Sequence, residues 1–247
     1  MHFLLLVAAG LLAGTMNAVA GGGSFISFPV MVLVGLPPIA ANATSTVALF
    51  PGTMASTWAY RGDPRGIAGI SLKTLLPISV VGGSIGAILL LVTPGAAFDL
   101  VIPWLLLLAT LTFAGGRHLG DWLRRYVRIG RGAFLVIQFI LSIYGGYFGG
   151  AIGLMMMAVW TLIDSAELKA MAPTRTALVS ATNGAAVLCF ALAGAVYWPE
   201  MLAMMVSAIA GGYYGARFAR HLPPTVLKWF VVVLSATVTV AFFLRRY

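Results

Sequence analysis

The sequence predicts an all-α integral membrane protein made of two repeats of four apolar segments, and three observations lead to this fold class. Hydrophobic residues make up 61% of the 247 residues and charged residues only 9%, whereas soluble domains carry about 25% charged residues. Eight apolar runs approach the roughly 20 residues that a membrane span needs. Glycine and polar motifs occur twice in the same order, about 130 residues apart. The runs cover residues 3–20, 38–60, 67–91, 98–115, 133–163, 172–196, 199–216 and 225–244.

The first apolar unit, residues 3–34, is too long for one straight crossing. As a helix it would measure about 48 Å, against a hydrocarbon core about 30 Å thick. Gly21-Gly22-Gly23 interrupts it and Pro37-Pro38 follows its end. We therefore expect either a steeply tilted broken helix or a hairpin that turns back inside the protein.

The second unit, residues 38–60, opens on a polar cluster, Asn42-Ala43-Thr44-Ser45-Thr46. Asn42 or Thr44 can serve as a helix N-cap. One cap does not need four polar side chains in five residues, so the cluster is also a candidate binding site.

The next two units carry packing and boundary signals. Gly82-Gly83 with Gly86, in the run 67–91, is typical of helices that pack closely in membranes. After the run 98–115, the basic stretch 117–131 reads as a cytoplasmic connector between a first repeat, 1–116, and a second repeat, 132–247.

The second repeat presents the same signals in the same order. Its first run, 133–163, is interrupted at Gly145-Gly146 and at Gly149-Gly150, and the run 172–196 opens on Thr174-Arg175-Thr176. Gly211-Gly212 then matches the packing glycines of the first repeat. Arg175 occupies the position that Ser45 has in the first cluster.

Positive charge distinguishes a tilted first unit from a hairpin. If every unit crossed once with the N-terminus inside, the residues placed outside would include Lys169, Arg175, Arg217, Arg220 and Lys228. If both first units are hairpins and the N-terminus is outside, all of these become cytoplasmic, together with the run 117–131. Basic residues concentrate on the cytoplasmic side, so the hairpin arrangement is favoured. It leaves three crossings per half, and the repeats would then be inverted.

The glycine interruptions indicate where a ligand would approach bare backbone. Amide N–H groups at the start of a half-helix attract anions, and Arg175 is either a cytoplasmic anchor or the counter-charge of an anionic substrate. Asn17 and Asn183, inside apolar runs, either bond neighbouring helices or face the pathway. The candidate substrate-binding residues are Asn17, Gly22, Gly23, Ser24, Asn42, Thr44, Ser45, Gly150, Gly153, Thr174, Arg175 and Asn183.

Catalysis, cofactors and metals find no support in the sequence. Cys189 is the one cysteine, and His2, His118 and His221 do not have a metal-ligand spacing. We find no Ser/His/Asp set and no P-loop, so we expect neither an enzyme nor an ATP-driven pump. The formal net charge of +9 follows from cytoplasmic loops and calls for no nucleic-acid partner.

At these motifs the chain resembles the TauE/SafE family, the sulfite exporters and membrane transporters of unassigned substrate. The resemblance rests on residues 17–24, 29, 35–38 and 41–45, and on 145–153 and 174–176 in the second half. It implies a multi-pass inner-membrane carrier with two four-segment halves that moves sulfite, sulfonates or related anions, often outward. The second half departs from the first at Ala172-Pro173, so the halves need not contribute equally to a site.

The leading functional hypothesis is a secondary transporter that exports a small sulfur-containing oxyanion, with one half rocking against the other. Its partners would be the anion, the bilayer and, by analogy with transporters of this size, a second copy in a homodimer. A carrier or channel for a cation or neutral solute, and a non-transporting membrane subunit, are the alternatives.

Overall fold

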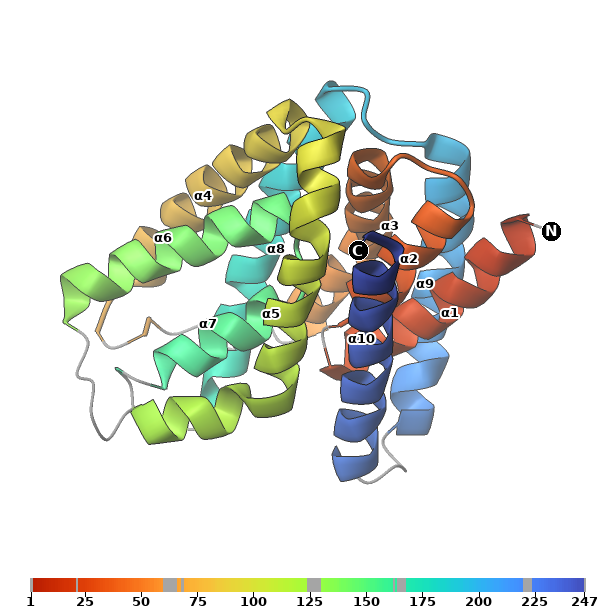
Figure 1. Ribbon diagram of the computed structural model, residues 1–247. Helices are drawn as coiled ribbons and strands as arrows, with labels where there is room; N and C mark the ends of the chain where they lie inside the picture. The colour runs from red at the N-terminus through yellow and green to blue at the C-terminus, as the bar shows by residue number, and fades with distance from the viewer. Residues whose placement is uncertain are drawn as a thin grey trace.

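The computed structural model describes residues 2–20, 22–59, 66–67, 69–123, 130–161, 163, 168–219 and 224–246, and this part of the chain is almost entirely helical (Figure 1). The prediction of an all-α protein is confirmed. The described helices are α1 (His2–Ala20), α2 (Ser24–Leu33), α3 (Pro38–Ala59), α4 (Leu72–Val92), α5 (Gly95–Leu123), α6 (Arg131–Tyr147), α7 (Ile152–Trp160), α8 (Leu168–Leu192), α9 (Trp198–Ala219) and α10 (Pro224–Arg246).

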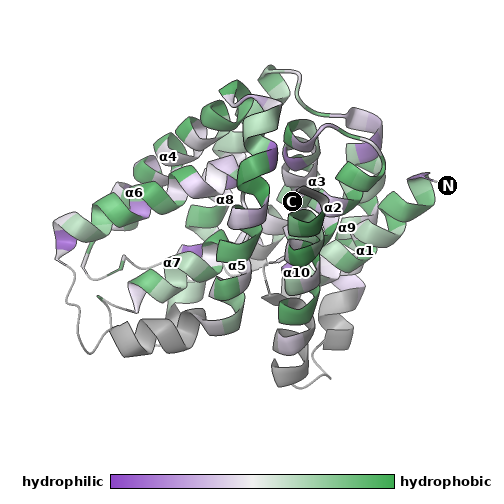
Figure 2. Ribbon diagram, viewed as in Figure 1, coloured by the Kyte–Doolittle hydropathy of each residue, from purple (hydrophilic) through white to green (hydrophobic). Residues whose placement is uncertain are grey.

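Hydrophobic residues occur along all the helices that Figure 2 colours, and many of their large side chains are exposed. Leu33 is 76% exposed and Leu192 is 88% exposed, and exposed leucine, isoleucine and valine recur along most helices. Three described helical stretches are long and apolar enough to cross a membrane: Leu72–Val92, Gly95–Gly115 and Met171–Leu192. A surface of this kind is stable in lipid and not in water.

The first unit is a hairpin rather than a tilted crossing, and the contacts of α1 establish this. Helix α1 runs beside α9 in the same direction, because Gly10 packs on Met204 and Gly14 packs on Ala208. Helix α3 begins beside the start of α9, where the Tyr197 amide is bonded to α3. Since α2 leads into α3, the chain enters through α1 and returns through α2 to the same end of the bundle.

The unit α6–α7 is also a hairpin, and it enters from the other end. The Phe50 ring of α3 packs on Gly184 of α8. Further along α3, Thr57 contacts Ser180, which comes earlier in α8, so these two helices are antiparallel. Helix α7 is antiparallel to α8, and α6 is antiparallel to α7, where the Trp160 indole N–H donates to Gln138. Helix α7 therefore runs with α3 and returns the chain to the end where α8 begins.

Close backbone approaches explain the paired glycines outside the breaks. A Cβ on Gly146 of α6 would overlap the carbonyl of Gly83 on α4, and one on Gly83 would lie 2.5 Å from the Thr182 carbonyl of α8. On α9, a Cβ on Gly211 would overlap the Leu11 carbonyl of α1. The packing role expected for Gly83 and Gly211 is confirmed. Gly145-Gly146, expected to interrupt the chain, instead lies inside α6, because both glycines admit neighbours that a side chain would displace.

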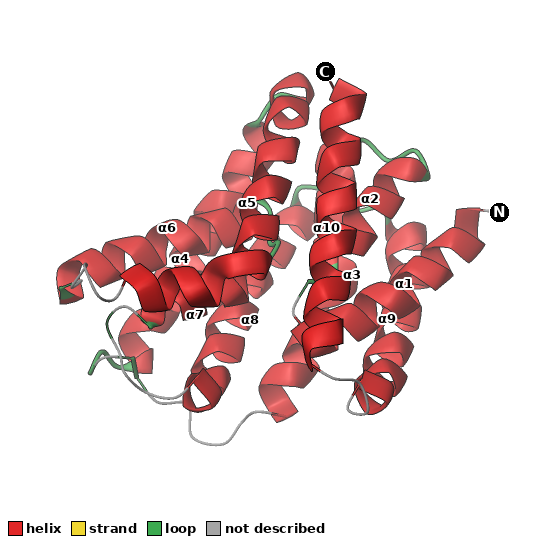
Figure 3. Cartoon of the chain, turned by 60° about the horizontal axis from the view of Figure 1, so that its bottom comes forward, coloured by secondary structure: helices red, strands yellow, loops and turns green. Residues whose placement is uncertain are grey.

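The described helices gather into two groups that we name the first and second bundles (Figures 1 and 3). The first bundle contains α1, α2, α3 and α9, and the second contains α4 to α8 together with α10, which packs mainly on α5. The main contact between the bundles is that of α3 with α8. Each bundle therefore combines helices from both predicted repeats, 1–116 and 132–247. That the repeats are inverted copies stays a prediction.

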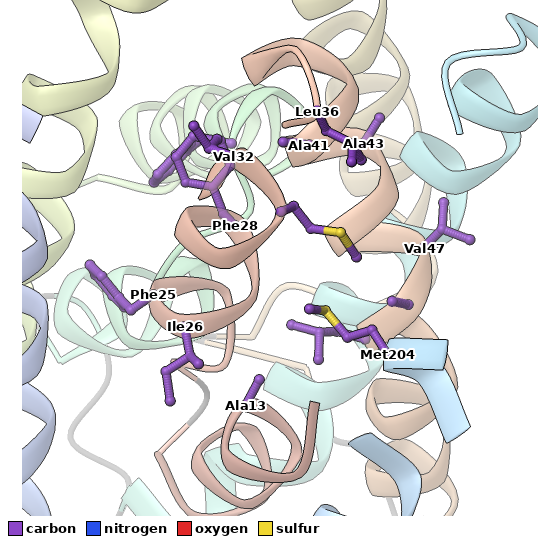
Figure 4. Packing of buried hydrophobic residues seen from close by; sticks show 14 of the residues in the cluster. Ala13, Phe25, Ile26, Phe28, Val32, Leu36, Ala41, Ala43, Val47 and Met204 are labelled. Carbon is purple, nitrogen blue, oxygen red and sulfur yellow. The ribbon is translucent and has the colours of Figure 1, made fainter. Parts of the chain in front are cut away.

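The core of the first bundle shows how α2 is held inside it (Figure 4). Phe28 and Phe25 are at most 1% exposed, and the cluster around them includes Ala13 of α1, Ala43 of α3 and Met204 of α9. A ten-residue helix is too short to be stable alone in water. Burial on several sides is what keeps α2 in place.

The substitution Gly146→Ala is expected to lower the free energy of unfolding by about 1–3 kcal/mol, because its methyl group overpacks the contact with α4. The matched control is Gly132→Ala in the same helix, where a Cβ would meet no atom within 4 Å. Thermal unfolding in detergent, followed by tryptophan fluorescence, measures both. Equal unfolding temperatures for the two variants would contradict the packing assigned to Gly146.

Candidate solute-binding site

The first break lies between α1 and α2 and is tightly packed. A Cβ on Gly22 would lie 2.7 Å from Phe113 Cζ, and one on Gly23 would lie 2.6 Å from the Ala13 carbonyl oxygen. The first amides of α2 are bonded locally, with Phe25 N–H donating to the Gly22 carbonyl at 3.1 Å. Close packing therefore explains these two glycines without a ligand.

Two polar side chains border the first break. Asn17 lies against Gly23, and its Nδ2 is 4.0 Å from where a Cβ on Gly52 would be. Ser24 is the first residue of α2 and is half-buried. Within the described part of the chain we find no hydrogen bond from either side chain, so both can bond a solute or water.

The second break reverses the chain between α6 and α7. Gly149 has φ 76° and Ala151 has φ 60°, so a left-handed conformation occurs on both sides of Gly150. Alanine adopts this conformation at a cost. The Tyr144 hydroxyl donates to the Gly150 carbonyl at 2.9 Å and satisfies a backbone group that the turn would otherwise leave open.

Arg175 reaches the second break from α8. A Cβ on Gly153 would lie 3.4 Å from Arg175 Cδ, and Arg175 Nη1 donates to Met157 Sδ at 3.4 Å. The half-buried side chain thus extends along the first turns of α7. Its neighbour Thr174 is fully buried. The structure places Arg175 beside Gly153. That these residues bind a solute stays a prediction.

The Asn42 cluster holds elements together. Asn42 Nδ2 donates to the Tyr147 carbonyl at the second break, over 3.0 Å. Thr44 Oγ1 accepts the Tyr197 amide at 3.0 Å. Ser45 shares a hydrogen bond of 2.6 Å with a serine of α2, at position 27. The cluster of the first half therefore supports the break of the second half, and each of its three candidate residues has a protein partner.

Asn183 is on α8, three residues beyond Ser180. It is on the face of α8 that meets α3, and its Oδ1 is buried without a hydrogen-bond partner. On the same face, Thr57 of α3 lies 2.7 Å from Ser180 of α8, hydroxyl to hydroxyl. The sequence analysis missed Thr57 and Ser180. The signal was present as hydroxyl residues four apart in each helix, namely Thr53, Thr57, Thr176 and Ser180.

Among the described side chains at the second break, the charged one is Arg175. Among the described residues, no group of three His, Cys, Asp or Glu side chains could hold a metal ion. The described acidic side chains, Asp99 and Glu200, lie near the starts of α5 and α9. The predicted connector 117–131 falls mostly outside the described side chains, although the backbone of α5 continues to Leu123.

Comparisons with known proteins agree on one family. The family model described as Sulfite exporter TauE/SafE matches residues 6–242. A probable membrane transporter protein, ORF9, of Sinorhizobium sp is 30% identical, over 97% of this chain and 92% of its own length. A probable membrane transporter protein of Haemophilus influenzae is 28% identical, over 95% and 92%. Probable membrane transporter protein YfcA of Escherichia coli K12 is 26% identical, over 93% and 85%. No solved structure matches the chain.

The substitution Asn42→Leu is expected to lower the free energy of unfolding by about 1–3 kcal/mol even without any anion, because the bond to the Tyr147 carbonyl is lost. Thermal unfolding in anion-free detergent buffer measures the change. Thr112→Val is the control, since its hydroxyl bonds only the Leu108 carbonyl of its own helix in the described structure. An unchanged unfolding temperature for Asn42→Leu would show that the bond from Asn42 to the Tyr147 carbonyl does not stabilise the fold.

Proposed function

Because the chain belongs to the sulfite exporter TauE/SafE family, we propose that it is a secondary transporter that exports a small sulfur-containing oxyanion, such as sulfite or an organosulfonate. The family and the apolar helices make the chain a multi-pass membrane protein, a transporter rather than an enzyme. The proposal adds the anion, the outward direction, the inner membrane as its location and alternating access as its mechanism.

The observation that carries the anion proposal is the position of Arg175. Its Cδ lies beside Gly153 in the first turn of α7, and its Nη1 donates to Met157 Sδ about one turn further along that helix. A planar guanidinium can donate two hydrogen bonds at once to an oxyanion such as a sulfonate. The partial positive charge of the helix start adds to this attraction.

The low polarity of the surroundings makes such a contact effective. Coulomb interactions strengthen as the local dielectric constant falls. The half-buried Arg175, whose side chain lies along Gly153 and Met157, would therefore attract an anion more than a neutral solute. The alternative of a cation carrier would place a second positive charge beside Arg175.

The hairpins support an inverted-repeat transporter as part of the same proposal. The unit α1–α2 and the unit α6–α7 enter from opposite ends of the molecule, as in transporters with inverted repeats. A homodimer remains part of the proposal by analogy alone.

The substitution Arg175→Gln is expected to reduce sulfite efflux from proteoliposomes by about tenfold or more, because one charge-assisted contact with the anion is lost. Sulfoacetate tests the organosulfonate class in the same assay. Arg131→Gln, an exposed arginine at the start of α6, is the control and should keep the parent rate.

Two outcomes contradict the proposal. Unchanged efflux in a folded Arg175→Gln protein would remove Arg175 from the site. Stabilisation of the purified protein by cations, with none by anions across matched salts, would favour the cation carrier instead.

A further inference from the structure

Contacts within each bundle are close and rigid. The described helix pairs with the most extensive contact are α1 with α9 and α4 with α6. In both pairs a glycine brings backbones together, as Gly14 does on Ala208 and Gly146 does on Gly83. Interlocked backbones of this kind move as one body. Each pair also joins a helix of one predicted repeat to a helix of the other, so the repeats cannot separate along these lines.

Contacts between the bundles have a different character. Where α3 meets α8, Thr57 Oγ1 lies 2.7 Å from Ser180 Oγ and 3.0 Å from the Thr176 carbonyl oxygen. Where α2 meets α10, the rings of Phe28 and Phe242 stack with their centroids 5.6 Å apart. Among the described residues, no glycine brings the backbones of α3 and α8 together, and Gly184 of α8 is met by the Phe50 ring.

Thr57 can release its partners in the other bundle without losing all of its hydrogen bonds. Its Oγ1 also lies 3.1 Å from the Thr53 carbonyl oxygen of its own helix. Threonine and serine commonly bond the carbonyl one turn earlier in a helix. Ser180 instead donates across the contact, to the Thr53 carbonyl at 3.3 Å. Parting of α3 from α8 therefore leaves Thr57 bonded and exposes the Ser180 hydroxyl to water or a solute.

Asn183, unlike Thr57, has an unsatisfied polar atom while the two helices are in contact. Its Oδ1 is buried without a partner while α3 and α8 are in contact. It lies one turn beyond Ser180, at the level where Phe50 packs on Gly184. A buried amide oxygen without a partner is unfavourable, and it gains a hydrogen bond as soon as water or a solute reaches it. Separation of the helices would provide that access.

Asn42 supplies a fixed point for such a movement. Its bond to the Tyr147 carbonyl joins the bundles near the start of α3, whereas Thr57 lies near the end of that helix. The two bonds are about four helical turns apart. The end marked by Thr57 can open while the end marked by Asn42 stays closed.

From these observations we infer that the moving bodies are the two bundles and not the two sequence halves, and that the solute passes along the α3–α8 contact and meets Asn183. This rests on the proposed transport function and corrects the expectation that one half rocks against the other. The solute class is the anion of that proposal, with Asn183 bonding its polar atoms. The contact is closed at Thr57 and Ser180 in this structure.

Paired cysteines test which bodies move. In a Cys189→Ser background, Thr57→Cys with Ser180→Cys joins the two bundles, and oxidation should reduce sulfoacetate flux by about tenfold or more, with recovery on reduction. Sulfoacetate is used because sulfite cleaves disulfides. The control pair, Ser79→Cys with Ser142→Cys, joins the two sequence halves inside the second bundle, where the hydroxyls are 3.5 Å apart. Its oxidised form should keep the parent flux.

The reverse result overturns the inference. If the oxidised Ser79/Ser142 pair stops flux while the oxidised Thr57/Ser180 pair does not, the sequence halves are the moving bodies. Gel mobility of a protease-cut chain establishes that each disulfide has formed. A parent protein that moves no sulfoacetate and no sulfite would contradict the proposed function, and the labelling experiment below would still decide this inference.

Thiol labelling tests Asn183 without any transport assay. In the same background, Asn183→Cys should react with a water-soluble methanethiosulfonate about tenfold faster than Thr182→Cys. Thr182 is the neighbouring residue and packs on Gly83 within the second bundle. Sulfoacetate should slow the reaction at position 183 alone. Equal, slow labelling at both positions would show that the α3–α8 contact does not open to solutes.

Discussion

The structure depends on one constraint, which is that a helix ending inside apolar surroundings must have its backbone groups bonded by protein. At the second break the Tyr147 carbonyl is bonded by Asn42 and the Gly150 carbonyl by Tyr144. Phe28 of α2 covers the same turn, with its ring 5.9 Å from that of Phe148. The need to cover each break therefore accounts for the position of α2 and of the start of α3.

Local signals in the sequence predicted the helices, their interruptions and the packing glycines. Apolar length and runs of glycine act over a few residues, so Gly83 and Gly211 could be interpreted without knowing their neighbours. The pairing of α1 with α9 could not, because it joins residues about 200 positions apart and many helices offer a similar apolar face. Charge favoured the hairpins, but the contacts of Gly10, Gly14 and Thr44 were needed to establish the direction of α1 and α3.

The candidate site was predictable by residue type more than by arrangement. An arginine at the start of an apolar run is unusual enough to identify Arg175, and it lies beside Gly153. Asn42 also attracted attention, but its partner is a backbone carbonyl 105 residues away, which no spacing rule indicates. Thr57 and Ser180 were missed because hydroxyl side chains in helices usually bond their own backbone.

The composition of the bundles bears on how the protein is made. The second bundle takes α4 to α8 from one continuous stretch and adds α10, whereas the first bundle needs α1 to α3 and then α9. During synthesis, α4 to α8 can assemble as soon as they are inserted. Helices α1 to α3 must wait until α9 emerges, with the glycine face of α1 open to lipid or to an insertion factor. The last two helices synthesised thus complete the two bundles, one each.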